Sequence, residues 1–140
     1  MNLLRIALLG LITTAWAAAQ SATLSADLAK LSPAGGQLTL TATVTYDDTP
    51  GAIGWSVKLP EGWALLTTSG PDLPAVNPDP GAAGTLEWAY TSIPPNRVQF
   101  LFAVSYPAKT ALPAEIASTV IVRTKGALKT IAPVPIQFTP

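Results

Sequence analysis

The sequence contains neither cysteine nor histidine among its 140 residues. Their absence excludes Ser-His-Asp and Cys-His catalysis, thiol redox chemistry, and the usual zinc, copper and haem ligand sets. Beyond residue 19 there is also no Ser-x-x-Lys spacing and no phosphate-binding glycine loop. The sequence therefore predicts a protein that is not an enzyme and that carries no cofactor.

Charged side chains are scarce as well, with eight basic and eight acidic residues in the whole chain. No basic stripe is present, so nucleic acid is not an expected partner. No basic amphipathic segment is present either, which argues against binding to a membrane surface. Because 49% of the residues are apolar and only 11% are charged, the composition is the reverse of the disordered type.

The first residues predict a secretory signal peptide over residues 1–19. Arg5 supplies a positive start, an apolar run follows, and small residues favour cleavage after Ala17 or Ala19. The run is short for a permanent membrane span, which needs ~20 residues, although an uncleaved N-terminal anchor is the alternative. We expect a secreted or periplasmic protein, of bacterial type given the missing cysteines. Residues 20–140 are then one ordinary domain.

The strongest local pattern is a period of two over residues 37–46. A β-strand sends successive side chains to opposite faces, so this pattern predicts a strand with one buried face. Threonine is β-branched and tolerates the solvated face of a strand. The apolar set is Leu38, Leu40, Ala42, Val44 and Tyr46, and the opposite set is Thr39, Thr41, Thr43 and Thr45.

Similar runs recur along the chain, separated by turn residues. Seven or eight short strands with regular turns predict an all-β, immunoglobulin-like (cohesin-like) antiparallel β-sandwich. The connection over residues 70–84 is the longest and is rich in proline; a plain crossover between the sheets is favoured over a functional loop. Pro133 and Pro135 make the last run an edge strand or an interrupted one. The expected strands are 22–28, 37–46, 53–59, 63–68, 86–90, 98–106, 115–124 and 128–138.

The segment between the third and fourth expected strands predicts a tight reversal. Pro60 presets the first corner of a turn, and Gly62 can adopt a positive φ. We expect a tight three-residue reversal with a bulge, which delivers Trp63 into the next strand.

Several local motifs run through the middle of the chain. They are Leu-Pro-Glu-Gly-Trp at 59–63, Gly-Trp at 54–55, Gly-Thr-Leu-Glu-Trp at 84–88, Val-Gln-Phe-Leu-Phe at 98–102 and Tyr-Pro at 106–107. This layout resembles the immunoglobulin-like or cohesin-like β-sandwich modules of bacterial and archaeal surface and exported proteins, over most of residues 22–125. The resemblance implies a non-catalytic module of surface architecture, adhesion or assembly. Such modules usually sit in long multidomain chains, whereas we expect a single module here.

Four aromatic residues are the candidate ligand-binding side chains: Trp55, Trp63, Trp88 and Tyr90. Exposed in a row, they would form a platform for stacking sugars or for binding a protein. Buried, they would simply belong to the core, and their period of two favours burial for each. Trp63 directly follows the turn, so its side is the least fixed by the pattern.

The acidic residues offer two further hypotheses. Glu61 and Glu87 could serve a glycosidase, which needs two carboxylates about 5 to 9 Å apart, but a solvated turn residue and an outward strand residue are favoured. A calcium site would draw on the loop carboxylates, although their spacing matches no known calcium loop and ordinary turn aspartates are favoured. The calcium candidates are Asp47, Asp48, Asp72 and Asp79.

The leading hypothesis is a non-catalytic exported module of structural or interaction type, working through its sheet faces or edges. Its partner would be another envelope or extracellular protein. The alternative is a small carbohydrate-binding module that contacts a polysaccharide through exposed aromatic side chains.

Overall fold

The structure is a computed structural model, and it describes residues 20–140. The predicted signal peptide, with its cleavage after Ala17 or Ala19, lies outside the described residues. The described part of the chain consists of nine strands joined by turns and loops. Within residues 20–140 there is no helix of the length and apolar character needed to cross a bilayer.

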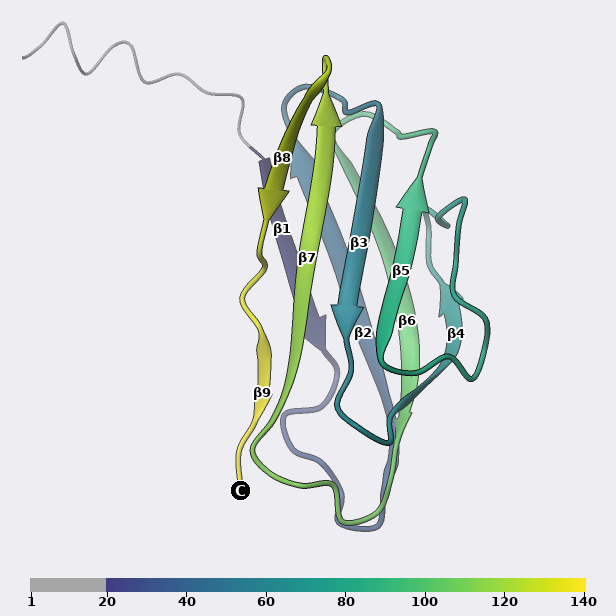
Figure 1. Cartoon of the computed structure of the whole chain (residues 1–140), viewed down its shortest axis with the longest axis vertical. Coiled ribbons are helices and arrows are strands. Elements are labelled where there is room, and N and C mark those ends of the chain that lie inside the picture. The colour runs from purple at the N-terminus through teal and green to yellow at the C-terminus, as the bar shows by residue number, and fades with distance from the viewer. Residues whose placement is uncertain (1–19) are drawn as a thin grey trace, which may run out of the picture.

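Two antiparallel sheets make up the molecule (Figure 1). Sheet A has the order β1 (Gln20–Ala26), β2 (Gly36–Tyr46), β6 (Arg97–Tyr106) and β4 (Ala64–Ser69). Sheet B has the order β5 (Thr85–Tyr90), β3 (Ala52–Lys58), β7 (Ala114–Thr124) and β8 (Ala127–Ile131), and β9 (Ile136–Phe138) also pairs with β7. The predicted immunoglobulin-like, cohesin-like sandwich is confirmed.

The core lies between the two sheets and follows the period of two in the sequence. Strand β2 buries Leu38, Leu40, Ala42, Val44 and Tyr46, while its threonines occupy the outer face of sheet A. Strand β6 buries alternate residues in the same way, from Val98 to Tyr106, and lies between β2 and β4. Because each sheet buries one face against the other, the alternation alone identifies the core positions.

The last expected strand is divided in two, which is why nine strands are present where seven or eight were expected. Pro133 and Pro135 lie between β8 and β9, and a proline cannot donate a hydrogen bond to a ladder. Strand β8 pairs with the end of β7, and β9 pairs with its beginning. The prediction of an interrupted edge strand is confirmed.

The tight reversal at residues 60–62 forms as predicted, but the bulge lies elsewhere. Gly62 has a φ of 85°, and the N–H of Trp63 donates to the carbonyl of Pro60 at 3.2 Å. The strands on either side do not pair as a hairpin, because β3 belongs to sheet B and β4 to sheet A. The turn is therefore a corner between the sheets, which carries Trp63 into the core. The register shift in this region lies instead within β4, between Leu65 and Thr67.

The long connection over residues 70–84 crosses from β4 in sheet A to β5 in sheet B, as predicted. It hydrogen-bonds to both edges on the way. The N–H of Leu65 donates to the carbonyl of Ala82 at 2.8 Å, and Val76 forms an antiparallel bridge with Ala89 of β5. Figure 1 shows the connection beside β4 and β5. This side of the sandwich is closed by the chain itself.

Candidate functional site

The four candidate aromatic residues all lie in the core. Trp55, Trp63 and Trp88 are 2% exposed or less, and Tyr90 is 4% exposed. Burial was the favoured prediction for each, including Trp63. A stacking platform for sugars requires an exposed ring face, and these four residues do not provide one.

Trp88 shows the structural role of these aromatic rings. Its ring centroid lies 4.7 Å from that of Phe102 and 5.1 Å from that of Phe100, both on β6 of the opposite sheet. Its indole N–H donates to the hydroxyl of Thr68 on β4 at 3.0 Å. Trp55 meets Phe100 edge to face at 5.8 Å. The aromatic residues therefore hold the two sheets together.

The two glutamates suggested for glycoside hydrolysis lie on different kinds of structure. Glu61 is exposed in the corner turn, whereas Glu87 is exposed on the outer face of sheet B. A hollow lies beside Glu87 on this outer face, and Glu87 is the one carboxylate among the residues that line it. No second carboxylate faces it there, so this hollow lacks the pair that glycoside hydrolysis needs.

The four aspartates suggested for calcium are distributed over two loops. Asp47 and Asp48 follow β2, while Asp72 and Asp79 belong to the long connection. Within residues 20–140, no group of three or more acidic side chains is arranged to hold a metal ion.

Asp72 has a structural role at the end of the core. Its carboxylate accepts the backbone N–H of Gln99 at 3.0 Å, and its carbonyl accepts the hydroxyl of Tyr90 at 2.5 Å. Its backbone N–H donates to the carbonyl of Gln99 at 3.1 Å. Burial, and secondarily the charge of Asp72, raises the pKa of the Tyr90 hydroxyl. The same two causes, in the same order, raise the pKa of Tyr46, whose hydroxyl donates to the carbonyl of Pro94.

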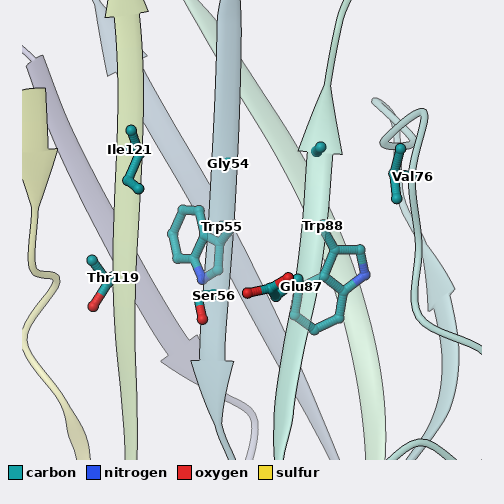
Figure 2. Close-up of a pocket in the computed structure, with 9 residues that line it drawn as sticks. Gly54, Trp55, Ser56, Val76, Glu87, Trp88, Thr119 and Ile121 are labelled. Atoms are coloured by element: carbon teal, nitrogen blue, oxygen red, sulfur yellow. The ribbon is translucent and has the colours of Figure 1, made fainter. Parts of the chain in front are cut away.

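A hollow of about 300 Å³ lies on the outer face of sheet B, and we call it the sheet B groove (Figure 2). Its side chains come from β3, β5 and β7, and Val76 of the long connection forms one wall. The lining residues are Gly54, Trp55, Ser56, Val76, Glu87, Trp88, Ala89, Thr119 and Ile121.

Register explains why the face is hollow at this point. Gly54 of β3 lies between Ala89 of β5 and Ile121 of β7, so a residue without a side chain occupies the middle of a cross-strand row. A Cβ built on Gly54 would meet no atom within 4 Å. Val76 and Ile121 rise on either side and are 55% and 47% exposed. The groove is therefore apolar, and the next row adds Ser56 between Glu87 and Thr119.

Sequence reasoning missed this groove. The sequence contained one sign of an exposed apolar site, which is Ile121. It is an aliphatic residue at an outward position of β7, in a series that also contains the polar residues Glu115, Thr119 and Arg123. Val76 carried no such signal, since it lies in the proline-rich connection.

No protein-family model matches the chain. No curated protein sequence matches it either. Solved structures do match. The N-terminal domain of a Streptococcus gordonii adhesin is similar with a TM-score of 0.66 at 11% identity, over 84% of this chain and 32% of that one. The major pilin SpaD of Corynebacterium diphtheriae is similar with a TM-score of 0.62 at 10% identity, over 84% and 35%.

A non-cellulosomal cohesin from the archaeon Archaeoglobus fulgidus is also similar, with a TM-score of 0.55 at 15% identity, over 84% of this chain and 89% of that one. This chain thus spans about a third of the adhesin and pilin chains, and most of the cohesin. At such identities the likeness establishes the fold: the chain has the β-sandwich architecture that adhesin, pilin and cohesin domains use.

Proposed function

We propose that this protein is an exported, non-catalytic interaction module that binds a protein partner through the sheet B groove. The observation that carries the proposal is the exposed aliphatic pair, Val76 and Ile121, on either side of the bare backbone at Gly54. Exposed apolar surface with a polar rim is typical of sites for protein partners.

The chemistry of the groove favours a protein over a polysaccharide. A sugar ring stacks on an exposed aromatic face, and the aromatic residues at the groove, Trp55 and Trp88, are buried beneath it. Aliphatic walls instead suit one or two apolar side chains of a partner. Glu87 and Arg123 are exposed on the same face and can select the partner's charges.

The opposite face of the molecule makes a useful contrast. The outer face of sheet A presents threonine and serine from β1 and β2, such as Thr23, Thr41 and Thr43. Aliphatic side chains of the kind that line the groove are absent from those two strands' outer positions. Strand β6 does carry Leu101 and Ala103 at outer positions, but both are partly buried, and the exposed large aliphatic residues include none from the strands of sheet A. We therefore assign binding to sheet B.

The N-terminal residues support a proposal about the place of action. We propose that residues 1–19 direct export and are removed, and that residues 20–140 act as one domain in the periplasm or outside the cell. The adhesin, pilin and cohesin structures that share this architecture are compatible with a surface role.

The variant Gly54→Val tests the groove. The backbone at Gly54 is outside the left-handed region and no atom lies within 4 Å of an added Cβ, so valine should fill the hollow while the fold remains. Purified wild-type protein would be used to select from a displayed peptide library. We expect peptides with paired aliphatic residues, and we expect Gly54→Val to weaken their binding at least about tenfold.

Thr41→Val is the matched control, because it places the same side chain on the outer face of sheet A. Peptide binding should be unchanged by this variant. A panel of soluble polysaccharides, followed by tryptophan fluorescence, tests the alternative in parallel. Polysaccharide binding, or peptide binding that Gly54→Val leaves intact, would overturn the proposed function.

A further inference from the structure

The four edges of the two sheets differ in how they are protected. An exposed edge strand offers unpaired N–H and C=O groups to any passing strand, so proteins usually obstruct it. The edges at β4 and β5 are covered by the connection over residues 70–84. The edge of sheet B at β8 and β9 is broken by Pro133 and Pro135.

Strand β8 carries a further obstruction. Lys129 is paired with the fully buried Val122, so it lies on the inward side of the sheet, with its side chain exposed at the edge. An inward-pointing charge of this kind penalises a strand that would extend the sheet. The prolines and Lys129 therefore both protect the edge at β8 and β9 against pairing with another strand.

Strand β1 is the exception. It is seven residues long, pairs only with β2 in sheet A, and contains no proline and no charged side chain. Its register with β2 is regular from Gln20 to Ala26, without a bulge. Length, a regular register and lack of charge are the features that leave an edge able to accept another strand.

The hydrogen bonding of β2 fixes which groups of β1 are free. The N–H of Asp27, next after β1, donates to the carbonyl of Thr39, and the N–H of Tyr46 donates away from β1 to the carbonyl of Asn96. The first bond places an odd-numbered residue in a hydrogen-bonded pair with β2, and the second shows that Tyr46, the partner of the even-numbered Gln20, does not bond to β1. Hydrogen-bonded pairs alternate along an antiparallel ladder, so the odd-numbered residues of β1 are the ones that bond to β2. The N–H and C=O groups of the even-numbered residues therefore point out of the edge.

We propose that β1 is a self-association strand, which pairs antiparallel with β1 of a second copy about a twofold axis at Thr23. In this register Gln20 pairs with Ala26 of the other copy, and Ala22 pairs with Leu24. All four of these residues are even-numbered, so the outward groups of one copy meet those of the other. The two sheets A become one continuous eight-stranded sheet.

The side chains of β1 fit this arrangement. Ser21 meets Ser25, Thr23 meets Thr23, and Ala22 meets Leu24, so hydroxyl side chains stay on the outer face and apolar ones on the core face. The central five residues of β1 are symmetric in character about Thr23, with Ser21 matching Ser25 and apolar Ala22 matching Leu24, whereas Gln20 and Ala26 at the ends differ. This central symmetry is what favours a second copy over an unrelated strand. The sheet B groove lies on the other sheet and stays free.

Engineered cysteines test the register, because the chain has no cysteine of its own. Thr23 would form a non-hydrogen-bonded pair with its own copy, with Cα atoms about 4.5 Å apart, within the range for a disulfide. Ser25 would lie roughly 13 Å from Ser25 of the other copy, beyond that range. We expect mild oxidation of purified Thr23→Cys to give a covalent dimer, and the matched variant Ser25→Cys to remain uncrosslinked.

Ala22→Pro tests the interface without a cysteine. The N–H of Ala22 points out of the edge, so proline removes no hydrogen bond within the fold. Sedimentation of the wild type should show a dimer, Ala22→Pro should weaken it at least about tenfold, and Ala22→Val, which keeps the N–H, should not. A wild type that is monomeric at high concentration, or equal crosslinking of Thr23→Cys and Ser25→Cys, would overturn the proposal. Neither result affects peptide binding by the groove, so the two proposals fail separately.

Discussion

The two long sides of the sandwich differ in how their edge strands are covered. On one side the connection over residues 70–84 bonds to both β4 and β5 and closes the gap between the sheets. On the other side no chain joins β1 to the edge formed by β8 and β9 within the described residues. Covered edges need no protective residues, whereas uncovered ones depend on the sequence of the edge strand itself.

The core differs between the two sides as well. Beside the closed side, Trp88, Phe100 and Phe102 form a cluster of aromatic rings. At the open side, β1 contributes only Ala22, Leu24 and Ala26 to the core face. Strand β9 on the open side also buries Phe138, whose ring lies 6.1 Å from that of Trp63. Strand β1 itself should therefore carry less of the stability than the closed side, which leaves β1 available for association.

The largest expected effect is at the closed side. Trp88→Ala removes a fully buried ring and its bond to Thr68, and we expect a loss of about 3 to 5 kcal/mol in the free energy of unfolding. Leu24→Ala at the open side should cost about 2 kcal/mol, since Leu24 lies at an edge and is 8% exposed. Urea unfolding measures both. Equal losses would contradict the comparison between the two sides.

The next effect concerns the anchoring of the connection. Asp72→Ala removes the acceptor of the Gln99 N–H, and we expect a loss of about 1 to 2 kcal/mol together with faster proteolysis within residues 70–84. Asp79→Ala is the control, because Asp79 is exposed in the same connection. It should change stability by less than about 0.5 kcal/mol. If both variants are cleaved at the same rate, Asp72 does not anchor the connection.

Alkaline pH should lower the stability of the fold through Tyr90, which is bonded to Asp72. Burial first, and the charge of Asp72 second, raises the pKa of Tyr90 in the folded chain above the ordinary value of 10.0. A raised pKa of this kind stabilises the fold fully below pH 10, and the contribution is lost as the pH rises from there toward the folded pKa. Thermal unfolding should therefore show falling stability above pH 10.

Tyr90→Phe should reduce this alkaline slope, because it removes one of the two tyrosines with a raised pKa. At neutral pH it should cost about 1 kcal/mol through the lost bond to Asp72. An unchanged slope in Tyr90→Phe would show that another group controls alkaline unfolding.

The smallest expected effect is a gain in stability near the open side. The hydroxyl of Ser118 is buried on β7 without a hydrogen-bond partner, at the stretch where neither β8 nor β9 pairs with β7. Ser118→Ala removes this unsatisfied group, and we expect a gain of about 0.5 to 1 kcal/mol in the free energy of unfolding. A loss on urea unfolding would mean that the hydroxyl has a partner.

Much of the fold could be predicted from local patterns. The alternation in β2 and β6 identified the core face, the prolines at 133 and 135 predicted the interruption between β8 and β9, and the proline-rich connection was correctly read as a crossover. The aromatic residues were correctly placed in the core as well. These features depend on the period of a strand and on the geometry of proline, both of which act over a few residues.

Pairing between distant strands could not be predicted from such local patterns. The tight turn at residues 60–62 was predicted, but a turn sequence does not determine whether its two strands share a sheet, and here β3 and β4 belong to different sheets. The sheet B groove depends on the register that sets Gly54 between Ala89 and Ile121 and on the bridge that brings Val76 to β5. The sequence by itself determined which side chains face inward, since that follows from the period of two. Only the tertiary structure decided which strands are neighbours and which edge stays open, because those depend on packing between residues far apart in the chain.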